Sequence, residues 1–238
     1  MSNKPSGLSI VIPARNEEET IETVVTDCFN VITKIGLDYE IIVVDDGSTD
    51  KTRDIVNMLE CRSIINEGPD HGKGVALRAG FAAVRYDTII MLDADGSHRA
   101  EDIPILVQEF QKGYGLIVAD RFVGGSDEYT FLRSFGNRFL TMVFSWLFGV
   151  QLNDALNGYK IFKSCVFDSF IYTAKDFSIE IELLANAKRL DKSIGQVRSH
   201  ERKRSGGQAK SFAIKHGTSF LFRIIYERFR TAKFIDPK

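Results

Sequence analysis

TIIMLDAD, residues 88–95, joins an apolar, β-branched run to two aspartates separated by one alanine. Such a run predicts a buried strand, and Asp93 and Asp95 follow at its end. Two carboxylates placed there repel each other and lose hydration, so they need a compensating cation or hydroxyl groups. Paired carboxylates are hard oxygen ligands that suit Mg²⁺ or Mn²⁺, with a substrate diphosphate supplying further oxygens. The stretch therefore predicts a divalent-metal site at the end of a strand.

Two further strands are predicted to end in polar residues. Residues 39–44 are followed by Asp45 and Asp46, and residues 8–12 are followed by PARNEE, residues 13–18. In an open parallel sheet the carboxyl ends of the strands meet at one edge, where ligands bind. A turn with a helix N-cap is the alternative for each segment taken alone. Three such segments together favour a binding site at that edge.

The composition predicts one globular domain, because the 238 residues are 44% hydrophobic and 26% charged. The three cysteines show no C-x-x-C spacing, which indicates reduced thiols in a cytoplasmic protein and no zinc site. The N-terminus leads into a strand without an apolar signal segment, so we expect the catalytic body to stay in the cytoplasm. The formal net charge is −1, but ten Lys or Arg against two Glu in 198–233 give that segment +8 and leave −9 for the rest. A basic segment on an acidic body predicts an anionic partner, either lipid headgroups or phosphate.

Short β-rich runs alternate with helical patterns in the first half of the chain, which is typical of β-α-β units. We expect strands over 8–12, 39–45, 62–66, 88–92 and 115–119, and helices over 17–34, 48–59, 72–84 and 101–111. The predicted fold class is therefore α/β, a single domain with a Rossmann-like, mostly parallel sheet flanked by helices.

The second half contains two apolar helical segments. Residues 138–150 are apolar nearly all round, but at about a dozen residues they are shorter than the roughly 20 that a bilayer span needs, so we expect them to be buried or to lie in an interface. Residues 208–230 predict an amphipathic helix in which aromatic and basic residues alternate. This C-terminal helix either packs on the core or docks on a membrane surface. We accordingly divide the chain into a catalytic domain, 1–210, and a basic amphipathic helix with its tail, 211–238.

Two other motifs concern nucleotide binding. Asp46 stands before Gly47 and Ser48, at a junction where a carboxylate can accept hydrogen bonds from a nucleobase or a ribose. GPDHGKG, residues 68–74, is similar to a phosphate cradle in which Lys73 offers a cation. Its spacing is not that of a Walker A motif, and no G-x-G-x-x-G follows the first strand. P-loop enzymes and dinucleotide dehydrogenases are therefore disfavoured.

Taken together, the segments 13–18, 45–50, 72–74 and 93–95 resemble the family 2 glycosyltransferases of GT-A fold. The segments 119–122, 133–137, 154–160, 177–182 and 204–210 narrow the resemblance to the polyprenyl-phosphate, or dolichol-phosphate, sugar transferases. The resemblance covers about residues 8 to 210 and implies a single domain of GT-A type.

The resemblance also implies a role for particular residues. The donor nucleotide-sugar would be bound by Pro13, Ala14, Arg15, Glu17, Asp46, Gly72, Lys73, Asp93 and Ala94. Asp93 and Asp95 would hold Mg²⁺ or Mn²⁺ together with the sugar diphosphate. The acceptor phosphate would meet Arg121, Arg133, Arg204 and Lys210, which with Asp95 are the expected catalytic residues.

Three positions depart from the pattern of the family, and one of them is Arg198, which follows Val197 where relatives often have Pro. Ser97 stands where some relatives carry Gln, and a serine is a poorer metal ligand, so carboxylates and water would complete the site. Lys160 stands where Arg is common, and it replaces a planar fork with a point charge.

The chemistry of the acceptor decides whether a catalytic base is needed. A phosphate monoester has its second pKa near ~6, so at neutral pH it is largely a dianion and already nucleophilic. A sugar hydroxyl would instead need a carboxylate base, for which Asp154, Glu180 and Glu182 are the candidates. Glu180 and Glu182 would point to different faces of a helix, so at most one of them would reach the site.

We therefore expect a metal-dependent, inverting hexosyltransferase that moves mannose from GDP-mannose to dolichyl or polyprenyl phosphate. UDP-glucose is the alternative donor. The enzyme would lie at the cytoplasmic face of a membrane, against the lipid surface or a membrane-protein partner, and would not bind nucleic acid. A transferase acting on a saccharide hydroxyl and a non-catalytic nucleotide-sugar-binding module remain as alternatives.

Overall fold

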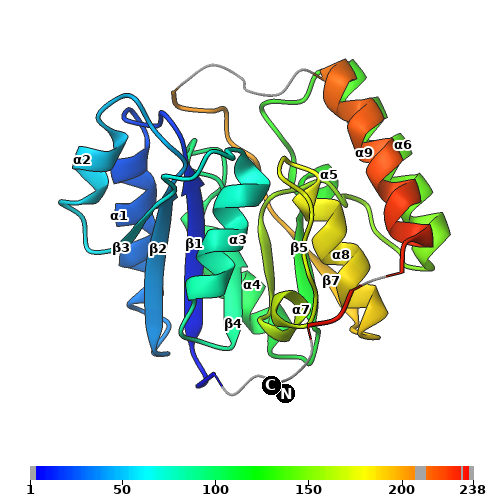
Figure 1. Ribbon diagram of the computed structural model, residues 1–238, viewed down its shortest axis with the longest axis horizontal. Coiled ribbons are helices and arrows are strands. Elements are labelled where there is room, and N and C mark those ends of the chain that lie inside the picture. The colour runs from blue at the N-terminus through cyan, green and yellow to red at the C-terminus, as the bar shows by residue number, and fades with distance from the viewer. Residues whose placement is uncertain (1–3, 207–212, 232, 236–238) are drawn as a thin grey trace.

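The structure is a computed structural model that describes residues 4–206, 213–231 and 233–235. Its described residues form one seven-stranded sheet in the order β3-β2-β1-β4-β6-β5-β7 (Figure 1). The strands are β1 (Leu8–Ala14), β2 (Tyr39–Asp45), β3 (Arg62–Ile65), β4 (Thr88–Met91), β5 (Leu116–Asp120), β6 (Lys160–Lys163) and β7 (Ile194–Arg198). Strand β6 runs antiparallel to both of its neighbours, and the other pairings are parallel. The predicted α/β class with a mostly parallel sheet is confirmed.

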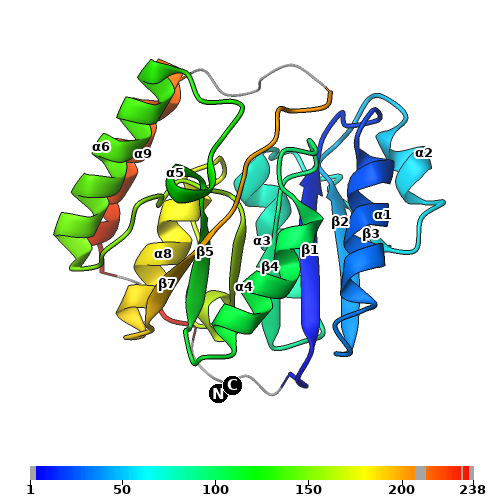
Figure 2. The same ribbon diagram turned by 180° about the vertical axis from the view of Figure 1, so that it is seen from behind.

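The helices are α1 (Ile21–Ile32), α2 (Thr52–Val56), α3 (Lys73–Ala83), α4 (Ile103–Phe110), α5 (Arg121–Gly124), α6 (Phe131–Phe148), α7 (Cys165–Asp168), α8 (Ile179–Arg189) and α9 (Ala213–Phe229), with a 3₁₀ turn η1 (Ala100–Asp102) before α4. Helices α3 and α8 cover one face of the sheet and α1 and α4 cover the other (Figures 1 and 2). The alternating side chains of β1 divide between the two layers, because successive residues of a strand point to opposite faces. Val11 packs in the layer of Leu77 from α3, whereas Ile10 packs in the layer of Val25 from α1.

Helices α6 and α9 lie side by side at the β5–β7 end of the sheet (Figures 1 and 2). Helix α9 also packs against α8. Buried ion pairs hold α9 in this place: Glu182 of α8 accepts from Arg223 at 2.6 Å and from Arg230 at 2.8 Å, and Glu227 pairs with Arg189 of α8 at 2.9 Å. The expected boundary between residues 210 and 211 lies outside the described residues, so the division of the chain stays a prediction.

Several expected elements differ from the observed ones. Helix α6 begins at Phe131 rather than at 138, because the Thr130 side chain caps it by accepting from the Arg133 N–H at 3.3 Å. Its apolar residues are not uniformly buried, since only Leu140, Thr141 and Phe144 are. The antiparallel β6 was not expected, because the last predicted strand ended at residue 119.

Candidate active site

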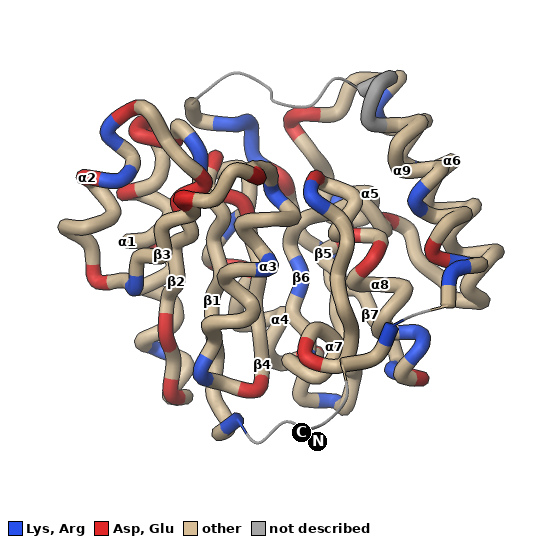
Figure 3. The backbone as a smooth tube through the Cα atoms, in the orientation of Figure 1, with Lys and Arg blue, Asp and Glu red and all other residues tan. Residues whose placement is uncertain are grey.

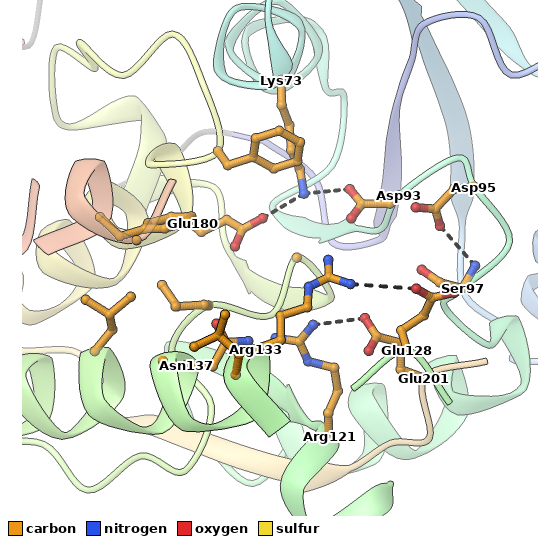
Figure 4. A pocket seen from close by; sticks show the side chains of 18 of the residues that line it. Lys73, Asp93, Asp95, Ser97, Arg121, Glu128, Arg133, Asn137, Glu180 and Glu201 are labelled. Atoms are coloured by element: carbon orange, nitrogen blue, oxygen red, sulfur yellow. Dashed lines mark hydrogen bonds and ion pairs between the residues drawn. The ribbon is translucent and has the colours of Figure 1, made fainter. Parts of the chain in front are cut away.

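The three polar strand ends meet at one edge of the sheet, as predicted. Acidic and basic residues lie close together above the carboxyl ends of β1, β2 and β4 (Figure 3). Asp93 and Asp95 lie in the loop that follows β4. The backbone N–H of Asp93 donates to Nδ1 of His98 at 3.0 Å, and the N–H of Ser97 donates to Oδ1 of Asp95 at 3.0 Å. These local bonds hold both carboxylates at the mouth of a pocket (Figure 4).

Protein cations already neutralise the aspartate pair. Nζ of Lys73, at the start of α3, lies 2.6 Å from Oδ1 of Asp93 and 2.7 Å from Oε1 of Glu180 (Figure 4). The guanidinium of Arg204 lies 2.8 Å from Oδ2 of Asp95. The aspartate pair was expected to need a compensating cation, and a metal ion was expected in that place. The structure shows that Lys73 and Arg204 supply positive charge within the chain itself.

The ion pairs set the ionisation of these groups. Burial alone would raise the pKa of Asp93, but Lys73, with His98 and Arg204, lowers it to about 2. Burial alone would lower the pKa of Lys73, and the carboxylates of Asp93 and Glu180 raise it above its ordinary value instead. Asp93 is therefore a carboxylate and Lys73 an ammonium at any physiological pH, which is the state that binding a cation or a diphosphate requires.

The donor set suits a cation that brings its own further ligands. Among the described residues, no group of three or more His, Cys, Asp or Glu side chains is arranged to hold a metal ion. Asp93 and Asp95 supply carboxylate oxygens, and Ser97, which is buried, lines the same pocket. Mg²⁺ and Mn²⁺ commonly take one or two carboxylates and complete their shell with water and substrate phosphates. The residues therefore fit such an ion when it arrives with a diphosphate.

Asp46, just after β2, is the centre of a second polar cluster. Its carboxylate accepts from Nδ2 of Asn66 at 2.6 Å and from the N–H of Gly72 at 2.7 Å, and Nδ1 of His71 lies 3.3 Å away. The guanidinium of Arg15 approaches to 3.9 Å. The cluster thus joins three of the residues expected to bind the donor. Asn66 and His71 were not predicted, although His71 precedes Gly72 in the glycine-rich segment that had been singled out.

The other residues that were expected to bind the donor hold this edge of the sheet in place. Pro13 and Ala14 are the last residues of β1, and the carbonyl of Ala14 accepts from the N–H of Asp46 at 2.9 Å. The hydroxyl of Thr20 donates to the carbonyl of Ala94 at 2.8 Å and lies 3.4 Å from Oε2 of the buried Glu17. The β1–α1 loop is in this way fastened to the loop that carries the aspartate pair.

Gly72 is required by its surroundings as well as by its backbone. It has φ of 135°, and a Cβ there would lie 2.4 Å from the carbonyl oxygen of Lys175. Any side chain would push α3 away from the 174–176 segment and carry Lys73 with it. The glycine-rich turn, whose sequence is similar to a phosphate cradle, therefore places Lys73 between Asp93 and Glu180.

A cavity of about 380 Å³ extends from the aspartate pair. Arg133 of α6 lines it and lies 3.6 Å from Glu128, and the backbone N–H of Arg204 donates to the same carboxylate at 3.0 Å. Arg133 and Arg204 thus face one cavity, as expected for two residues that would meet one phosphate. Lys210, the fourth residue expected there, lies outside the described residues.

Arg121 also lines the cavity, but its guanidinium is bound to protein carboxylates, whereas its expected role requires it to bind the acceptor phosphate. It is buried, donates to both carboxylate oxygens of Asp154 at 2.7 and 2.9 Å, and donates to Glu201 at 2.9 Å. Burial opposes the charged form, but Asp154 and Glu201 raise the pKa of Arg121 well above its ordinary value. With its fork occupied by two carboxylates, Arg121 fixes the floor of the cavity, and a direct contact with a phosphate would require these bonds to open.

The cavity also has apolar walls. Leu132, Phe139, Leu140, Phe220 and Leu221 of α6 and α9 line it together with Leu156, and the ring of Phe177 lies 5.2 Å from Nζ of Lys73. Charged groups and apolar groups therefore line one space. A ligand with a phosphate head and a hydrocarbon tail matches this distribution.

The three candidate bases occupy different places. Asp154 is buried against Arg121, and Glu182 is buried in the ion pairs that hold α9. Glu180 lines the cavity and pairs with Lys73. Glu180 thus lines the cavity and Glu182 does not, as the helical spacing predicted.

Lys160, at the start of β6, is fully buried. Its ammonium donates to the carbonyl of Asn157. Burial lowers the pKa of Lys160 to about 8, against the opposing effect of Glu180. A lysine at this position therefore contributes a buried cation beneath the cavity.

Comparison with known proteins places this geometry in a family. The family model described as glycosyl transferase family 2 matches residues 9–172. Glycosyltransferase AglJ of Haloferax volcanii is 29% identical over 230 residues, which are 95% of this chain and 73% of the relative. Dolichyl-phosphate beta-glucosyltransferase ALG5A of Trichomonas vaginalis is 28% identical, over 97% of this chain and 77% of the relative.

Solved structures share the fold. The glucosyl-3-phosphoglycerate synthase of Mycobacterium tuberculosis, in complex with Mn²⁺, UDP and phosphoglyceric acid, superposes with a TM-score of 0.74 at 24% identity. The match covers 95% of this chain and 78% of that one. At this identity the likeness establishes the arrangement of sheet and helices.

Proposed function

Because the chain belongs to the family 2 glycosyltransferases, we propose that it transfers a hexose from a nucleoside-diphosphate sugar to a polyprenyl or dolichyl phosphate. One observation carries the proposal. A single cavity is lined by the Asp93–Asp95 pair, by Arg133 and Arg204, and by apolar side chains of α6 and α9. These three parts correspond to a sugar diphosphate, an acceptor phosphate and a lipid chain.

On this proposal the donor lies along the carboxyl ends of β1, β2 and β4. The Asp46 cluster binds the nucleoside, and the 13–17 segment packs beside it. Asp93 and Asp95 hold a divalent cation, which when bound neutralises charge on the leaving diphosphate. Lys73 is within reach of the same diphosphate, since its ammonium already lies 2.6 Å from Asp93. These residues stabilise the leaving group and need not change protonation.

The acceptor phosphate lies against Arg133 and Arg204 and attacks the anomeric carbon through one of its own oxygens. Because this oxygen is anionic at neutral pH, no protein base has to remove a proton. The structure offers little to a hydroxyl acceptor, as Asp154 is buried against Arg121 and Glu180 is held by Lys73. Attack from the face opposite the diphosphate inverts the anomeric centre.

The donor sugar remains open to two choices. The 204–210 segment favoured GDP-mannose, which stays a prediction. One relative is named a dolichyl-phosphate beta-glucosyltransferase, and this name supports glucose as the transferred sugar. Other relatives are named undecaprenyl-phosphate 4-deoxy-4-formamido-L-arabinose transferases, and the chain spans 53% of the first of these. Both names support a lipid phosphate as acceptor more strongly than they support any one sugar.

We further propose that α6 and α9 dock on a lipid surface. Phe131, Phe135, Phe139, Met142 and Trp146 recur at helical spacing on one side of α6 and are exposed, with Phe131 at 88% and Trp146 at 81%. We call these five residues the aromatic stripe. Helix α9 adds the exposed Phe222, Tyr226 and Phe229.

A bilayer is the occupant that this surface fits, because aromatic side chains favour the interface of a membrane and the proposed acceptor resides in one. Residues of both helices also line the cavity, so docking there would bring a lipid phosphate close to Arg133 and Arg204. No helix in the part of the chain that the structure describes is long and apolar enough to cross a bilayer. The cytoplasmic, peripheral location expected from the sequence is kept as part of this proposal.

The proposal is tested by following label from donor to lipid. Purified protein is incubated with Mn²⁺, with either radiolabelled UDP-glucose or GDP-mannose, and with a short polyprenyl phosphate and a panel of saccharides as competing acceptors. Label is counted in the organic extract and in the saccharides of the aqueous phase. We expect label in the extract with one donor, none with the corresponding polyprenol, and none with Asp95→Asn. Label that appears on a saccharide and not on the lipid phosphate would instead establish the hydroxyl-acceptor alternative.

A further inference from the structure

Asp93 and Asp95, the two carboxylates proposed to bind the cation, pair with basic residues that differ in whether a second carboxylate is at hand. Lys73 lies between Asp93 and Glu180, so its ammonium keeps a carboxylate partner if it leaves Asp93. Among the described residues, the side chain of Arg204 forms its ion pair with Asp95. Arg204 therefore has to find another anion if the oxygen at Asp95 is taken.

The backbone around Arg204 is fixed independently of its side chain. The N–H of Arg202 donates to the carbonyl of Ser97 at 2.9 Å, and the N–H of Ser205 donates to the carbonyl of Asp95 at 3.3 Å. The N–H of Arg204 itself donates to Glu128 at 3.0 Å. The guanidinium is 23% exposed and lines the cavity. It can consequently change partner within the cavity while the chain stays in place.

We infer that Arg204 is a counter-ion exchanged between two anions: it neutralises Asp95 before the donor binds, and it passes to the acceptor phosphate once a cation and a diphosphate occupy Asp95. This inference rests on the proposed function for the identity of the second anion. A divalent cation that approaches Oδ2 of Asp95 repels the guanidinium held 2.8 Å from the same oxygen, so cation binding weakens this ion pair. The released guanidinium meets the cavity that Arg133 also lines, and there the two arginines form a site for one phosphate.

The exchange makes the acceptor site depend on the donor. Before the donor binds, Arg204 is held by Asp95 and Arg133 lies near Glu128, so neither cation is free to bind phosphate. Donor binding releases one of them. The two ligands should therefore bind with positive coupling, and by thermodynamic reciprocity each should tighten the other by the same factor, typically about 5- to 150-fold.

The first half of the inference is tested with the metal alone. Mn²⁺ binding is measured by electron paramagnetic resonance of the free ion, without nucleotide and without acceptor. We expect Arg204→Gln to bind Mn²⁺ about tenfold more tightly than the unaltered protein, because a charge-assisted hydrogen bond to Asp95 no longer has to break. Two controls remove the same charge elsewhere. Arg202→Gln removes a guanidinium that lies two residues away and pairs with the exposed Glu101. Arg133→Gln removes a guanidinium that lines the same cavity but pairs with Glu128.

The controls separate ion-pair competition from a general change of charge. Neither should change Mn²⁺ affinity by more than about threefold, since neither residue contacts the aspartate pair. If Arg204→Gln binds Mn²⁺ no more tightly than the unaltered protein, or if Arg133→Gln tightens binding equally, the exchange is refuted. This measurement involves no acceptor, so its outcome is independent of whether a lipid phosphate is the true substrate.

The second half is tested on the unaltered protein, which avoids any question of misfolding. Binding of farnesyl phosphate is measured by calorimetry alone and in the presence of Mn²⁺ and UDP. We expect at least fivefold tighter binding with Mn²⁺ and UDP, and loss of that difference in Arg204→Gln. Equal binding under both conditions would overturn the exchange. No binding of farnesyl phosphate under either condition, together with tighter Mn²⁺ binding by Arg204→Gln, would instead show that the proposed acceptor is wrong while Arg204 still competes for Asp95.

Discussion

Replacing Lys160 with methionine should stabilise the folded protein at neutral pH. Lys160 is fully buried beneath the cavity, and its ammonium donates to the carbonyl of Asn157. Burial lowers its pKa from 10.5 to about 8, so the folded state holds this charge less favourably than the unfolded state does. Methionine has a similar length and carries no charge, and it removes that cost.

The size of the effect follows from the pKa. The gap between 10.5 and about 8 corresponds to about 3 kcal/mol of unfavourable free energy at pH values where the lysine is charged in both states. Methionine cannot donate to Asn157, which costs about 1 kcal/mol. We therefore expect Lys160→Met to raise the free energy of unfolding at pH 7 by about 2 kcal/mol.

The pH dependence has a definite sign. Between pH 8 and 10.5 the unfolded state binds the proton of Lys160 and the folded state does not, so the stability of the unaltered protein rises with pH in this window. Lys160→Met has no such group. Its advantage should therefore be greatest at or below pH 7 and should disappear by about pH 10.

The assay is urea unfolding of both proteins at pH 7, 8.5 and 9.5, with Lys163→Met as the matched control. Lys163 belongs to the same strand, but its side chain is 42% exposed and pairs with Asp87 at 2.9 Å. This control should change stability by less than about 1 kcal/mol. If Lys160→Met is less stable than the unaltered protein at pH 7, or if its advantage does not fall with pH, Lys160 is held as a favourable ion partner and the reasoning is wrong.

Three further predictions concern the acceptor, the membrane surface and the C-terminal helix. Arg133→Gln should raise KM for polyprenyl phosphate at least tenfold and leave KM for the donor unchanged, measured by initial rates, because it removes a phosphate contact; equal changes in both constants would contradict that placement. Trp146→Ser should weaken binding to lipid vesicles about tenfold in a sedimentation assay, since its indole is 81% exposed on the aromatic stripe; undiminished binding would exclude the stripe as the docking surface. Glu182→Gln should lower the free energy of unfolding by about 3 kcal/mol in urea, because Arg223 and Arg230 would lose the buried carboxylate they share; a change below 1 kcal/mol would mean that Glu227 compensates them by itself.

The fold class and the edge of the sheet that forms the site could be predicted because both depend on local pattern. Apolar runs of strand length ending in Asp46 and in Asp93 and Asp95 are visible in the sequence. Parallel strands place their carboxyl ends together whatever the details of packing, so these acids had to meet. The helical spacing of Glu180 and Glu182 likewise predicted that only one of them would reach the cavity.

The partners of these residues were decided by the tertiary structure alone. Lys73 and Glu180 are 107 positions apart, and nothing local in the sequence indicates that α3 and α8 lie close enough to pair them. The same holds for Arg204 with Asp95 and for Arg121, whose guanidinium is bound by Asp154 and Glu201. From the sequence, Lys73, Arg121 and Arg204 were expected to bind substrate phosphates. The packing of distant segments determined which protein carboxylate each of them pairs with.

The outward face of α6 illustrates the same division. Its apolar residues predicted a helix, but apolar residues can face a core, a partner or a lipid surface, and periodicity does not distinguish among them. Leu140 and Phe144 are buried in the same apolar cluster as Ile224 of α9, whereas the aromatic stripe is exposed. Local sequence thus determined what each segment forms, while long-range contacts determined what each surface of it faces, because burial depends on which distant segments pack beside it.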